Sequence, residues 1–208
     1  FRKNISKLVM GFCDYYKKSN NNLKLVICCA LSEQTKDLIK NNFKKNNIDL
    51  SNILMTGYVS EHDLQWLIKN SKYMIFPSLY EGLGLPILEA MYFKKVIITS
   101  KSSSMFELIP DKTFLVDPNS VESISKKLLE FDINIDYEKY KEISKVTLNN
   151  YSNKNQTKLF LNQIRNKLKQ RKDNIQISLL NFKIAIFTPL QPSKSGIGAY
   201  SSLVIKHL

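Results

Sequence analysis

Short apolar runs alternate with amphipathic stretches along most of this chain, and this alternation restricts the possible folds more than any other feature. Residues 23–30 are apolar almost throughout, which is typical of a strand that helices cover on both faces. Residues 33–45 instead place their apolar side chains at helical spacing. Repeated strand–helix units with short connections predict an α/β fold with a Rossmann-like, mainly parallel sheet and helices on both faces.

The positions of the expected elements follow from the same pattern. Strands are expected at residues 23–30, 52–59, 73–76, 96–99 and 114–116. Helices are expected near residues 5–12, 33–45, 64–68, 86–93 and 121–131, followed by two polar, lysine-rich helices over 136–170. Ligands of such sheets bind beyond the carboxyl ends of the strands, so a site is expected in the loops that follow the strands.

The strand pattern begins again near the C-terminal end. Residues 182–187 form a second apolar run, and a glycine-containing loop and a helical stretch follow it. A strand, a glycine loop and a helix belong to the beginning of a nucleotide-binding fold, not to its end. We therefore predict a first domain at 1–170, a linker at 171–181 and the beginning of a second domain at 182–208.

Length and composition allow one sizeable domain with a fragment of another. With 208 residues, of which 43% are hydrophobic, the chain can bury a core. No apolar run has the length needed to span a bilayer. The chain begins Phe1-Arg2-Lys3-Asn4, without an initiator methionine or a signal peptide, so we expect it to be a piece of a longer protein.

The net charge of +13 needs an explanation. Nucleic-acid binding would require basic residues on one face with aromatic residues between them. Here lysines are scattered over nearly every helix beside many asparagines, which indicates compositional bias and solvated surfaces. No nucleic-acid partner is expected, and attraction to an anionic membrane surface or a polyphosphate ligand is the second interpretation.

Cysteine and histidine give no sign of a metal site. The three cysteines, Cys13, Cys28 and Cys29, lack metal-ligand spacing, and the last two lie within an apolar run. Reduced thiols in the core of a cytosolic protein are the expected state. His62 begins a polar helical stretch and His207 lies at the C-terminal end, so both are expected to be solvent-exposed.

Residues 76–89 are the stretch most informative about chemistry, because they leave a buried strand and enter a helix. Gly82 and Gly84 allow the backbone to take positive φ and to approach a ligand without an obstructing Cβ. Pro86 suits the first turn of the helix, where a missing N–H costs nothing. The free N–H groups and the positive end of that helix are expected to bind phosphate.

Two carboxylates, Glu81 and Glu89, flank this anion site. On the phosphates themselves they would repel the ligand, so they suit the neutral ends of an elongated molecule. Glu89 is positioned to accept hydrogen bonds from a ribose diol, and Glu81 to meet a sugar on the other side of a diphosphate. A nucleotide diphosphate sugar has this arrangement. The alternative interpretation is ordinary turn glycines with solvated glutamates.

The whole string Glu-Gly-Leu-Gly-Leu-Pro-Ile-Leu-Glu after Phe-Pro-Ser resembles the E-x7-E signature of the family-4 retaining glycosyltransferases, which have the two-domain GT-B fold. The resemblance covers residues 1–170 and extends to the flanking segments, namely residues 2–5, 57–59 with Leu64, 96–100 and Glu107. It implies that the chain is the C-terminal, donor-binding half of such an enzyme. Residues 102–104 lie within this region and are expected to form a loop and a helix cap.

The resemblance also implies roles for individual residues. Lys3 is expected to pair with the donor diphosphate, Glu89 to hold the ribose, and Glu81 to act as the catalytic group that contacts the transferred sugar and steadies positive charge at its anomeric carbon. The backbone amides expected on the phosphates and sugar are those of Gly82, Leu83, Gly84 and Leu85. The family's usual arginine and the first strand of the domain would lie before residue 1. No cofactor or metal is expected, because the nucleotide sugar is the donor substrate.

A second resemblance involves residues 189–200, which look like the beginning of the acceptor-side domain of the same family. The glycine loop of Gly196, Ile197 and Gly198 would line the cleft there. The two resemblances suggest a tandem protein with two glycosyltransferase units, of which this chain is the middle. The isolated fragment is then expected to bind donor weakly and to turn over little.

The expected function is transfer of a hexose, with retention, to a saccharide or lipid-linked glycan acceptor in polysaccharide biosynthesis. Its partners would be the absent N-terminal domain and, through the basic charge, a peripheral contact with the membrane; the expected location is the cytoplasm at the inner membrane surface. One alternative is a phosphorylase-like or trehalose-phosphate-type enzyme on the same scaffold. Another is a non-catalytic Rossmann-like interaction module, in which the segment from Phe182 completes the sheet where the first strand would lie.

Overall fold

The computed structural model describes residues 2–19 and 23–170, which form parts of two compact units, Phe1–Leu148 and Asn149–Leu208. The predicted linker, the second glycine loop (Gly196, Ile197 and Gly198) and His207 lie outside the described residues. The domain boundaries drawn from the sequence therefore stay predictions.

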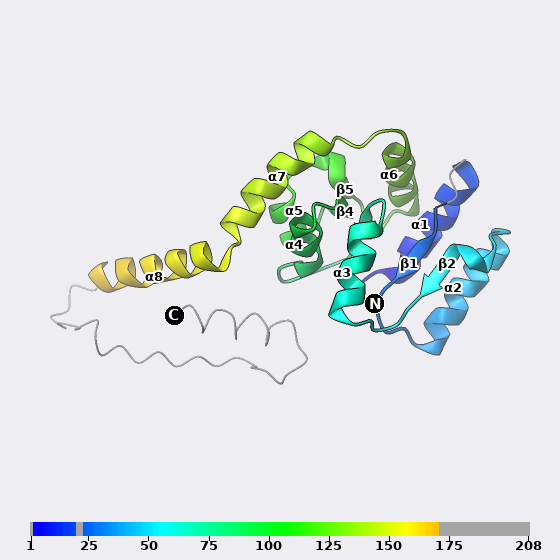
Figure 1. Ribbon diagram of the computed structural model, residues 1–208, viewed down its shortest axis with the longest axis horizontal. Coiled ribbons are helices and arrows are strands. Elements are labelled where there is room, and N and C mark those ends of the chain that lie inside the picture. Colours follow the sequence, from blue (N-terminus) through cyan, green and yellow to red (C-terminus); the bar gives the residue numbers. More distant parts are fainter. Residues whose placement is uncertain (1, 20–22, 171–208) are drawn as a thin grey trace. The chain divides into compact units, whose positions relative to one another are not determined.

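In the N-terminal unit, helices and strands alternate as the apolar pattern predicts (Figure 1). The strands are β1 Leu25–Ile27, β2 Ile53–Met55, β3 Met74–Phe76, β4 Ile97–Ser100 and β5 Leu115–Val116. The helices are α1 Ile5–Lys18, α2 Glu33–Lys45, α3 Glu61–Asn70, α4 Leu85–Tyr92, α5 Ser104–Leu108, α6 Val121–Ile133 and α7 Tyr137–Asn150, the last of which runs into the second unit; single 3-10 turns lie at Leu50–Asn52 and Lys112–Phe114.

Every described strand pairing is parallel, in agreement with the predicted fold class. The strands nevertheless form two sheets, β1-β2 and β3-β4-β5, so that β1 and β3 each have one partner among the described residues. Residues 23–30 and 52–59 were expected as longer strands than the three-residue β1 and β2. A strand extends only as far as its ladder of backbone hydrogen bonds, and here a single neighbour supports each of them.

Serine hydroxyls mark where several helices begin. Ser32, Ser60 and Ser120 precede α2, α3 and α6, and each accepts a hydrogen bond from the N–H three residues further on. Such caps satisfy a backbone donor that the helix itself leaves free. They fix the helix starts by local chemistry.

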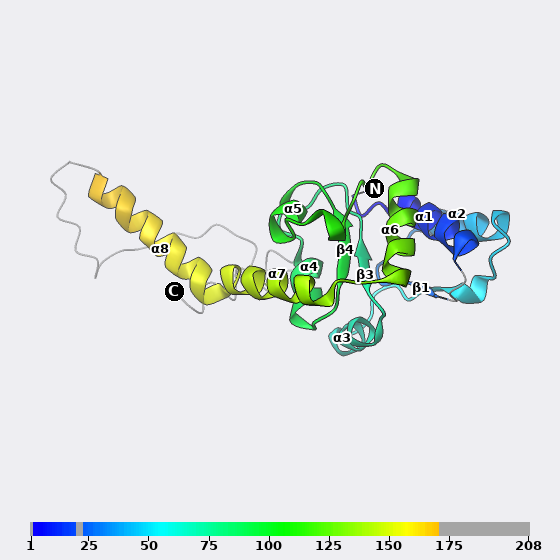
Figure 2. The same cartoon turned by 90° about the horizontal axis from the view of Figure 1, so that it is seen from above.

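The core of the N-terminal unit lies between the strands and the helices, with fully buried side chains from α1, α2, α4, α5 and α6. Helices α1 and α6 lie side by side on one side of the strands, with α3 on the other (Figure 2). Gly11 permits the close approach of α1 and α6, since a Cβ there would lie 2.5 Å from Cγ2 of the buried Ile124. Phe12 of α1 stacks on Phe43 of α2 with ring centroids 6.0 Å apart.

A buried carboxylate joins α1, α6 and the turn before β3. The side chain of Asp132 is 7% exposed and forms an ion pair with Lys72, with Nζ and Oδ1 2.8 Å apart. Asp132 also accepts hydrogen bonds from the hydroxyls of Tyr15 and Ser19. Burial, and then the hydrogen bond to Asp132, raise the pKa of Tyr15. A buried charge is tolerated only when it is paired in this way, so the cluster fixes how these three elements meet.

The cysteines are free thiols, as expected. Cys13 and Cys29 are buried and Cys28 is half-buried. Burial raises the pKa of the Cys13 thiol to about 11. Within the described ranges, no helix has both the length and the apolar character needed to cross a bilayer.

The described part of the second unit is dominated by α8, Asn153–Gln170. Ser152 precedes it and accepts a hydrogen bond from the N–H of Asn155 at 3.4 Å. The side chains of Leu159 and Phe160 are about half exposed on this helix.

The contact between α1 and α6 gives a first testable expectation. Gly11→Ala should lower the free energy of unfolding by about 1–3 kcal/mol, because the added methyl group overpacks a rigid β-branched neighbour and outweighs the better helix propensity of alanine. Urea denaturation followed by circular dichroism measures the change. Ser6→Ala, at an exposed position of the same helix, is the control and should change stability by less than about 0.5 kcal/mol. Equal stability of Gly11→Ala and the parent chain would contradict the close packing.

Candidate functional site

The candidate site lies where the loop after β3 enters α4, and the segment before α1 is fastened to this loop. The N–H of Leu79 donates to the carbonyl of Arg2 at 3.0 Å. Asn4 Nδ2 donates to the carbonyls of Pro77 at 3.0 Å and Pro118 at 2.7 Å. Residues 2–4 therefore lie at the carboxyl ends of β3 and β5, where ligands of parallel sheets bind.

Asn4 achieves this through an unusual conformation. It precedes α1 with φ of 56° and is buried, and its side chain does not cap the helix. Asparagine tolerates the left-handed region better than most residues. By bridging two loop carbonyls instead of capping α1, Asn4 fixes the position of the neighbouring Lys3. Lys3 is exposed and makes no ion pair with any described residue.

Glu81 is held on both carboxylate oxygens. Its side chain is 11% exposed and forms an ion pair with Arg2, whose side chain is 58% exposed. The other oxygen accepts a hydrogen bond from Ser78 Oγ at 3.0 Å. Neither Arg2 nor Ser78 was predicted as a site residue, since the arginine of the resemblance was expected before residue 1. The sequence indicated these two residues only by position: Arg2 is next to Lys3, and Ser78 lies three residues before Glu81.

The two glycines of the loop differ in what they provide. Gly84 has φ of 81° and precedes α4, and a Cβ there would lie 3.2 Å from Ile87 Cδ1. The expectation of positive φ is correct for Gly84 and wrong for Gly82, which does not adopt a left-handed conformation. A Cβ at Gly82 would meet nothing within 4 Å. The fold requires the glycine only at position 84, whereas position 82 faces open space.

Helix α4 provides the positive end predicted for an anion. It begins at Leu85 with Pro86 in its first turn, as expected. Pro86 has no N–H and the N–H of Ile87 donates to the carbonyl of Gly84 at 2.9 Å, so the amide of Leu85 is the first-turn donor that the helix leaves free. The helix dipole favours negative charge there. Leu83 and Leu85 flank Gly84 on either side, so their amides lie beside this helix end.

Glu89 lies in α4, four residues after Leu85. The side chain is reached by solvent, yet burial by the surrounding protein and then the charge of Glu61 raise its pKa. Both observations fit a carboxylate that water reaches from one side while protein surrounds the other. A ligand that donates hydrogen bonds to this carboxylate would stabilise its charged form.

Residues 102–104 do not form the expected cap. Ser103 precedes α5, but its side chain makes no capping hydrogen bond. The three hydroxyls instead bond to the backbone of the loop that carries Glu81. The capping interpretation is wrong because the backbone of Ser103, with φ of 48° and ψ of −146°, lies outside the extended region that a capping residue needs.

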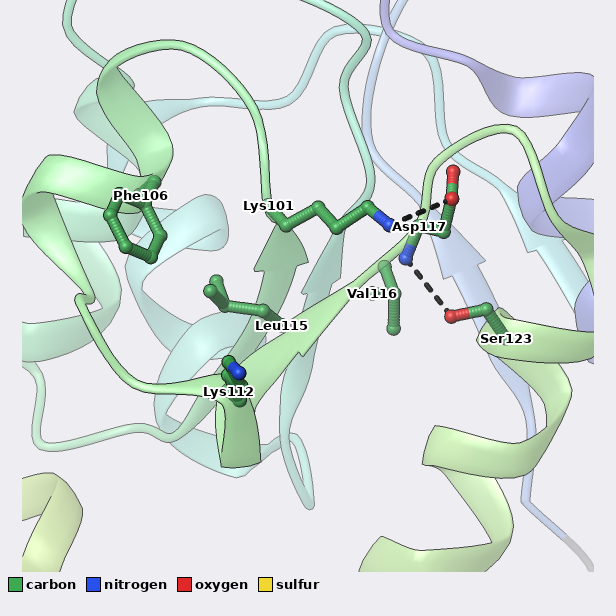
Figure 3. A pocket seen from close by; sticks show the side chains of 7 residues that line it. All are labelled: Lys101, Phe106, Lys112, Leu115, Val116, Asp117 and Ser123. Carbon is green, nitrogen blue, oxygen red and sulfur yellow. Dashed lines mark hydrogen bonds and ion pairs between the residues drawn. The ribbon is translucent and has the colours of Figure 1, made fainter.

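A separate pocket of about 510 Å³ lies along β5, from the 3-10 turn before the strand to Asp117 after it (Figure 3). It is lined by Lys101, Phe106, Lys112, Leu115, Val116, Asp117 and Ser123. Lys101 Nζ lies 2.9 Å from Asp117 Oδ2, and that hydrogen bond lowers the pKa of Asp117. None of the predicted site residues lines this pocket.

Metal ligands do not gather in the part of the chain that the structure describes, where no group of three or more His, Cys, Asp or Glu side chains meets. His62 is 90% exposed, as expected.

Comparison with known proteins gives the family of this chain. Residues 1–150 match the sequence profile of the family described as "Glycosyl transferases group 1". O-antigen chain mannosyltransferase B of Escherichia coli is 40% identical over 74 residues, which are 36% of this chain and 19% of that protein. The chain spans 15–22% of the length of the curated relatives it matches.

Solved structures share the fold. The C-terminal domain of LpcC, a glycosyl transferase group 1 family protein of Francisella tularensis, has a TM-score of 0.60 at 21% identity, over 72% of this chain and 80% of that one. A variant of S. aureus TarM in complex with fondaparinux, alpha-GlcNAc-glycerol and UDP has a TM-score of 0.64 at 23% identity, over 78% of this chain and 33% of that one. The predicted fold, half of a GT-B glycosyltransferase, is confirmed. Because the family profile matches 150 of the 208 residues, the chain belongs to the glycosyl transferases group 1 family.

Proposed function

We propose that the N-terminal unit is the donor-binding half of a retaining hexosyltransferase that takes its sugar from a nucleotide diphosphate. The observation that carries this proposal is the pair of glutamates, Glu81 before α4 and Glu89 within it, on either side of the helix N-terminus. Carboxylates repel phosphates, so the two suit the hydroxyl-bearing ends of a ligand whose diphosphate lies between them.

The diphosphate would bind the positive end of α4. The amides that face it are those of Gly82, Leu83, Gly84 and Leu85. Lys3, which is exposed and has no described ion pair, would add a positive charge. These donors stabilise the charge that grows on the diphosphate as the bond to the sugar breaks, and they need no reorganisation at that moment.

The glutamates would hold the two ends of the donor. Glu89 would accept hydrogen bonds from the vicinal hydroxyls of the ribose. These hydrogen bonds would stabilise the charged carboxylate, whose pKa is raised by burial. Glu81 would contact the transferred sugar and stabilise positive charge at the anomeric carbon. Its limited exposure and its two carboxylate partners support a fixed orientation for that role.

Arg2 would change partners when donor binds. In the free protein it pairs with Glu81, and its side chain is 58% exposed and accessible to a ligand. A diphosphate carries more negative charge than one carboxylate and matches the planar guanidinium, so it competes for Arg2. The exchange would leave one oxygen of Glu81 free for a hydroxyl of the sugar.

The whole protein would use this half together with an acceptor-binding domain. The mannosyltransferase and O-antigen names of the Escherichia coli relatives favour a hexose donor and a polysaccharide acceptor. The UDP in the TarM complex supports a nucleoside diphosphate as the leaving group. Function without a cofactor, at the cytoplasmic face of a membrane that attracts the basic chain, is part of the same proposal.

Nucleotide binding and its dependence on pH test the proposal directly. Calorimetric titration of the chain with UDP, GDP and ADP should show one preferred nucleotide. Affinity should fall as the pH is lowered through the raised pKa of Glu89, because the protonated acid is a poorer hydrogen-bond acceptor for the diol. Glu89→Gln should lower the affinity at neutral pH by at least about tenfold, which corresponds to about 1.4 kcal/mol.

Glu89→Gln, which should weaken nucleotide binding, should not lower the stability of the fold. A raised carboxyl pKa means that ionisation opposes folding, so Glu89 costs stability above its pKa and not below it. Glu89→Gln should therefore melt at or above the temperature of the parent chain at neutral pH, and the difference should vanish in acid. Glu142→Gln, an exposed glutamate of α7, is the matched control and should change neither property. Loss of both binding and stability in Glu89→Gln would assign Glu89 a structural role.

Alanine variants of the two loop glycines should distinguish an effect on folding from an effect on nucleotide binding. Gly84→Ala should lower the free energy of unfolding by about 1–2 kcal/mol, because alanine is strained at φ of 81°. Gly82→Ala should keep the melting temperature and weaken nucleotide binding by about tenfold, since its methyl group would occupy space that the ligand needs. Thermal melts and calorimetry on both variants measure this. Unchanged binding by Gly82→Ala would contradict the proposed position of the diphosphate.

A further inference from the structure

Five hydroxyl side chains continue the pairing of β3 and β4 beyond the end of the sheet. The backbone ladder between these strands ends at the pair Phe76 and Thr99. Beyond that point side-chain hydroxyls donate to backbone carbonyls, the first to the last residue of β3 and the other four to the loop after it. The bonds are Thr99 to Phe76 at 3.0 Å, Ser100 to Ser78 at 2.6 Å, Ser102 to Leu79 at 3.1 Å, Ser103 to Glu81 at 3.1 Å and Ser104 to Glu81 at 2.9 Å.

The series ends on the residue proposed to contact the sugar. The N–H of Glu81 donates to Ser103 Oγ at 3.1 Å, and the carbonyl of Glu81 accepts from both Ser103 and Ser104. Both backbone groups of Glu81 are therefore bonded to hydroxyls of one short segment. These partners lie 22 and 23 positions away in the sequence.

This arrangement also sets the direction of the next amide. A trans peptide is planar, and its N–H points opposite to its carbonyl. The carbonyl of Glu81 points at Ser103 and Ser104, so the N–H of Gly82 points away from them. The same two serines thus orient the Glu81 backbone and one of the amides proposed to bind phosphate.

Ser103 occupies an unfavourable backbone conformation in order to make these bonds. Its φ of 48° with ψ of −146° lies in a region that non-glycine residues rarely adopt. Strain of this kind persists only where the surrounding structure enforces it, and it gathers at functional sites. Glycine would suit the backbone better but would have no hydroxyl to offer to Glu81.

We propose that Ser103 and Ser104 are positioning residues that hold Glu81 and the Gly82 N–H in the geometry required to bind the donor, at the expense of backbone strain at Ser103. This inference rests on the proposed function for its binding consequence. The hydrogen bonds themselves do not depend on any ligand.

The test compares variants of the full chain by melting temperature, by calorimetric affinity for the preferred nucleotide diphosphate sugar, and by amide hydrogen exchange at Glu81. Ser103→Gly should change the melting temperature little, because relief of backbone strain offsets the loss of the hydrogen bonds to Glu81, while it binds about tenfold more weakly and its Glu81 N–H exchanges faster. Ser104→Ala should lose a smaller part of the affinity, and Ser104→Thr should restore it because the hydroxyl is kept. Ser102→Ala, whose hydroxyl bonds to Leu79, is the control and should leave the Glu81 exchange rate unchanged.

The outcomes separate this inference from the proposed function. If the parent chain binds no nucleotide sugar, the proposed function fails, and hydrogen exchange at Glu81 still decides whether the serines hold the loop. If Ser103→Gly binds as tightly as the parent chain, or if it loses affinity only in proportion to a lower melting temperature, the positioning role is wrong. Unchanged exchange at Glu81 in Ser103→Gly would also overturn it.

Discussion

The loop between β3 and α4 lies beyond the sheet, and its backbone groups must find partners that regular structure does not supply. A buried N–H or carbonyl without a partner costs as much as a lost hydrogen bond, so the whole neighbourhood is arranged around this loop. The side chain of Asn4 donates to the carbonyl of Pro77, and the carbonyl of Arg2 accepts from the N–H of Leu79. Hydroxyls of Ser100 and residues 102–104 bond to the backbone of Ser78, Leu79 and Glu81. The loop is thus held by hydrogen bonds within the protein.

Charge in the site is balanced locally, although the chain as a whole is strongly basic. Glu81 has Arg2 as its counter-ion, whereas Glu89 forms no ion pair with a described residue and burial raises its pKa. The two glutamates therefore differ in environment, which suits different tasks. In the proposed function, Glu81 would stay paired until a more negative ligand takes its arginine, and Glu89 would gain from a ligand that donates hydrogen bonds.

Stability and function make opposite demands at two positions of this site. Ser103 keeps a strained backbone to offer a hydroxyl, and Glu89 keeps a charge in a partly desolvated position. The rest of the unit compensates through ordinary means, namely close packing of α1 on α6 at Gly11 and a paired buried carboxylate at Asp132. Departures from local preference are expected to gather where a protein binds its ligand.

The sequence by itself determined what depends on neighbours along the chain. Alternating apolar runs predicted the α/β class, Pro86 predicted the start of α4, and the glycine loop with its two glutamates led to the prediction of a donor site. Only the tertiary structure decided that Arg2 pairs with Glu81, 79 positions away, that Asn4 bridges to Pro118, 114 positions away, and that Ser103 bonds to Glu81 instead of capping α5. Local periodicity carries no information about such partners, because they meet only when parallel strands bring their carboxyl ends to one edge.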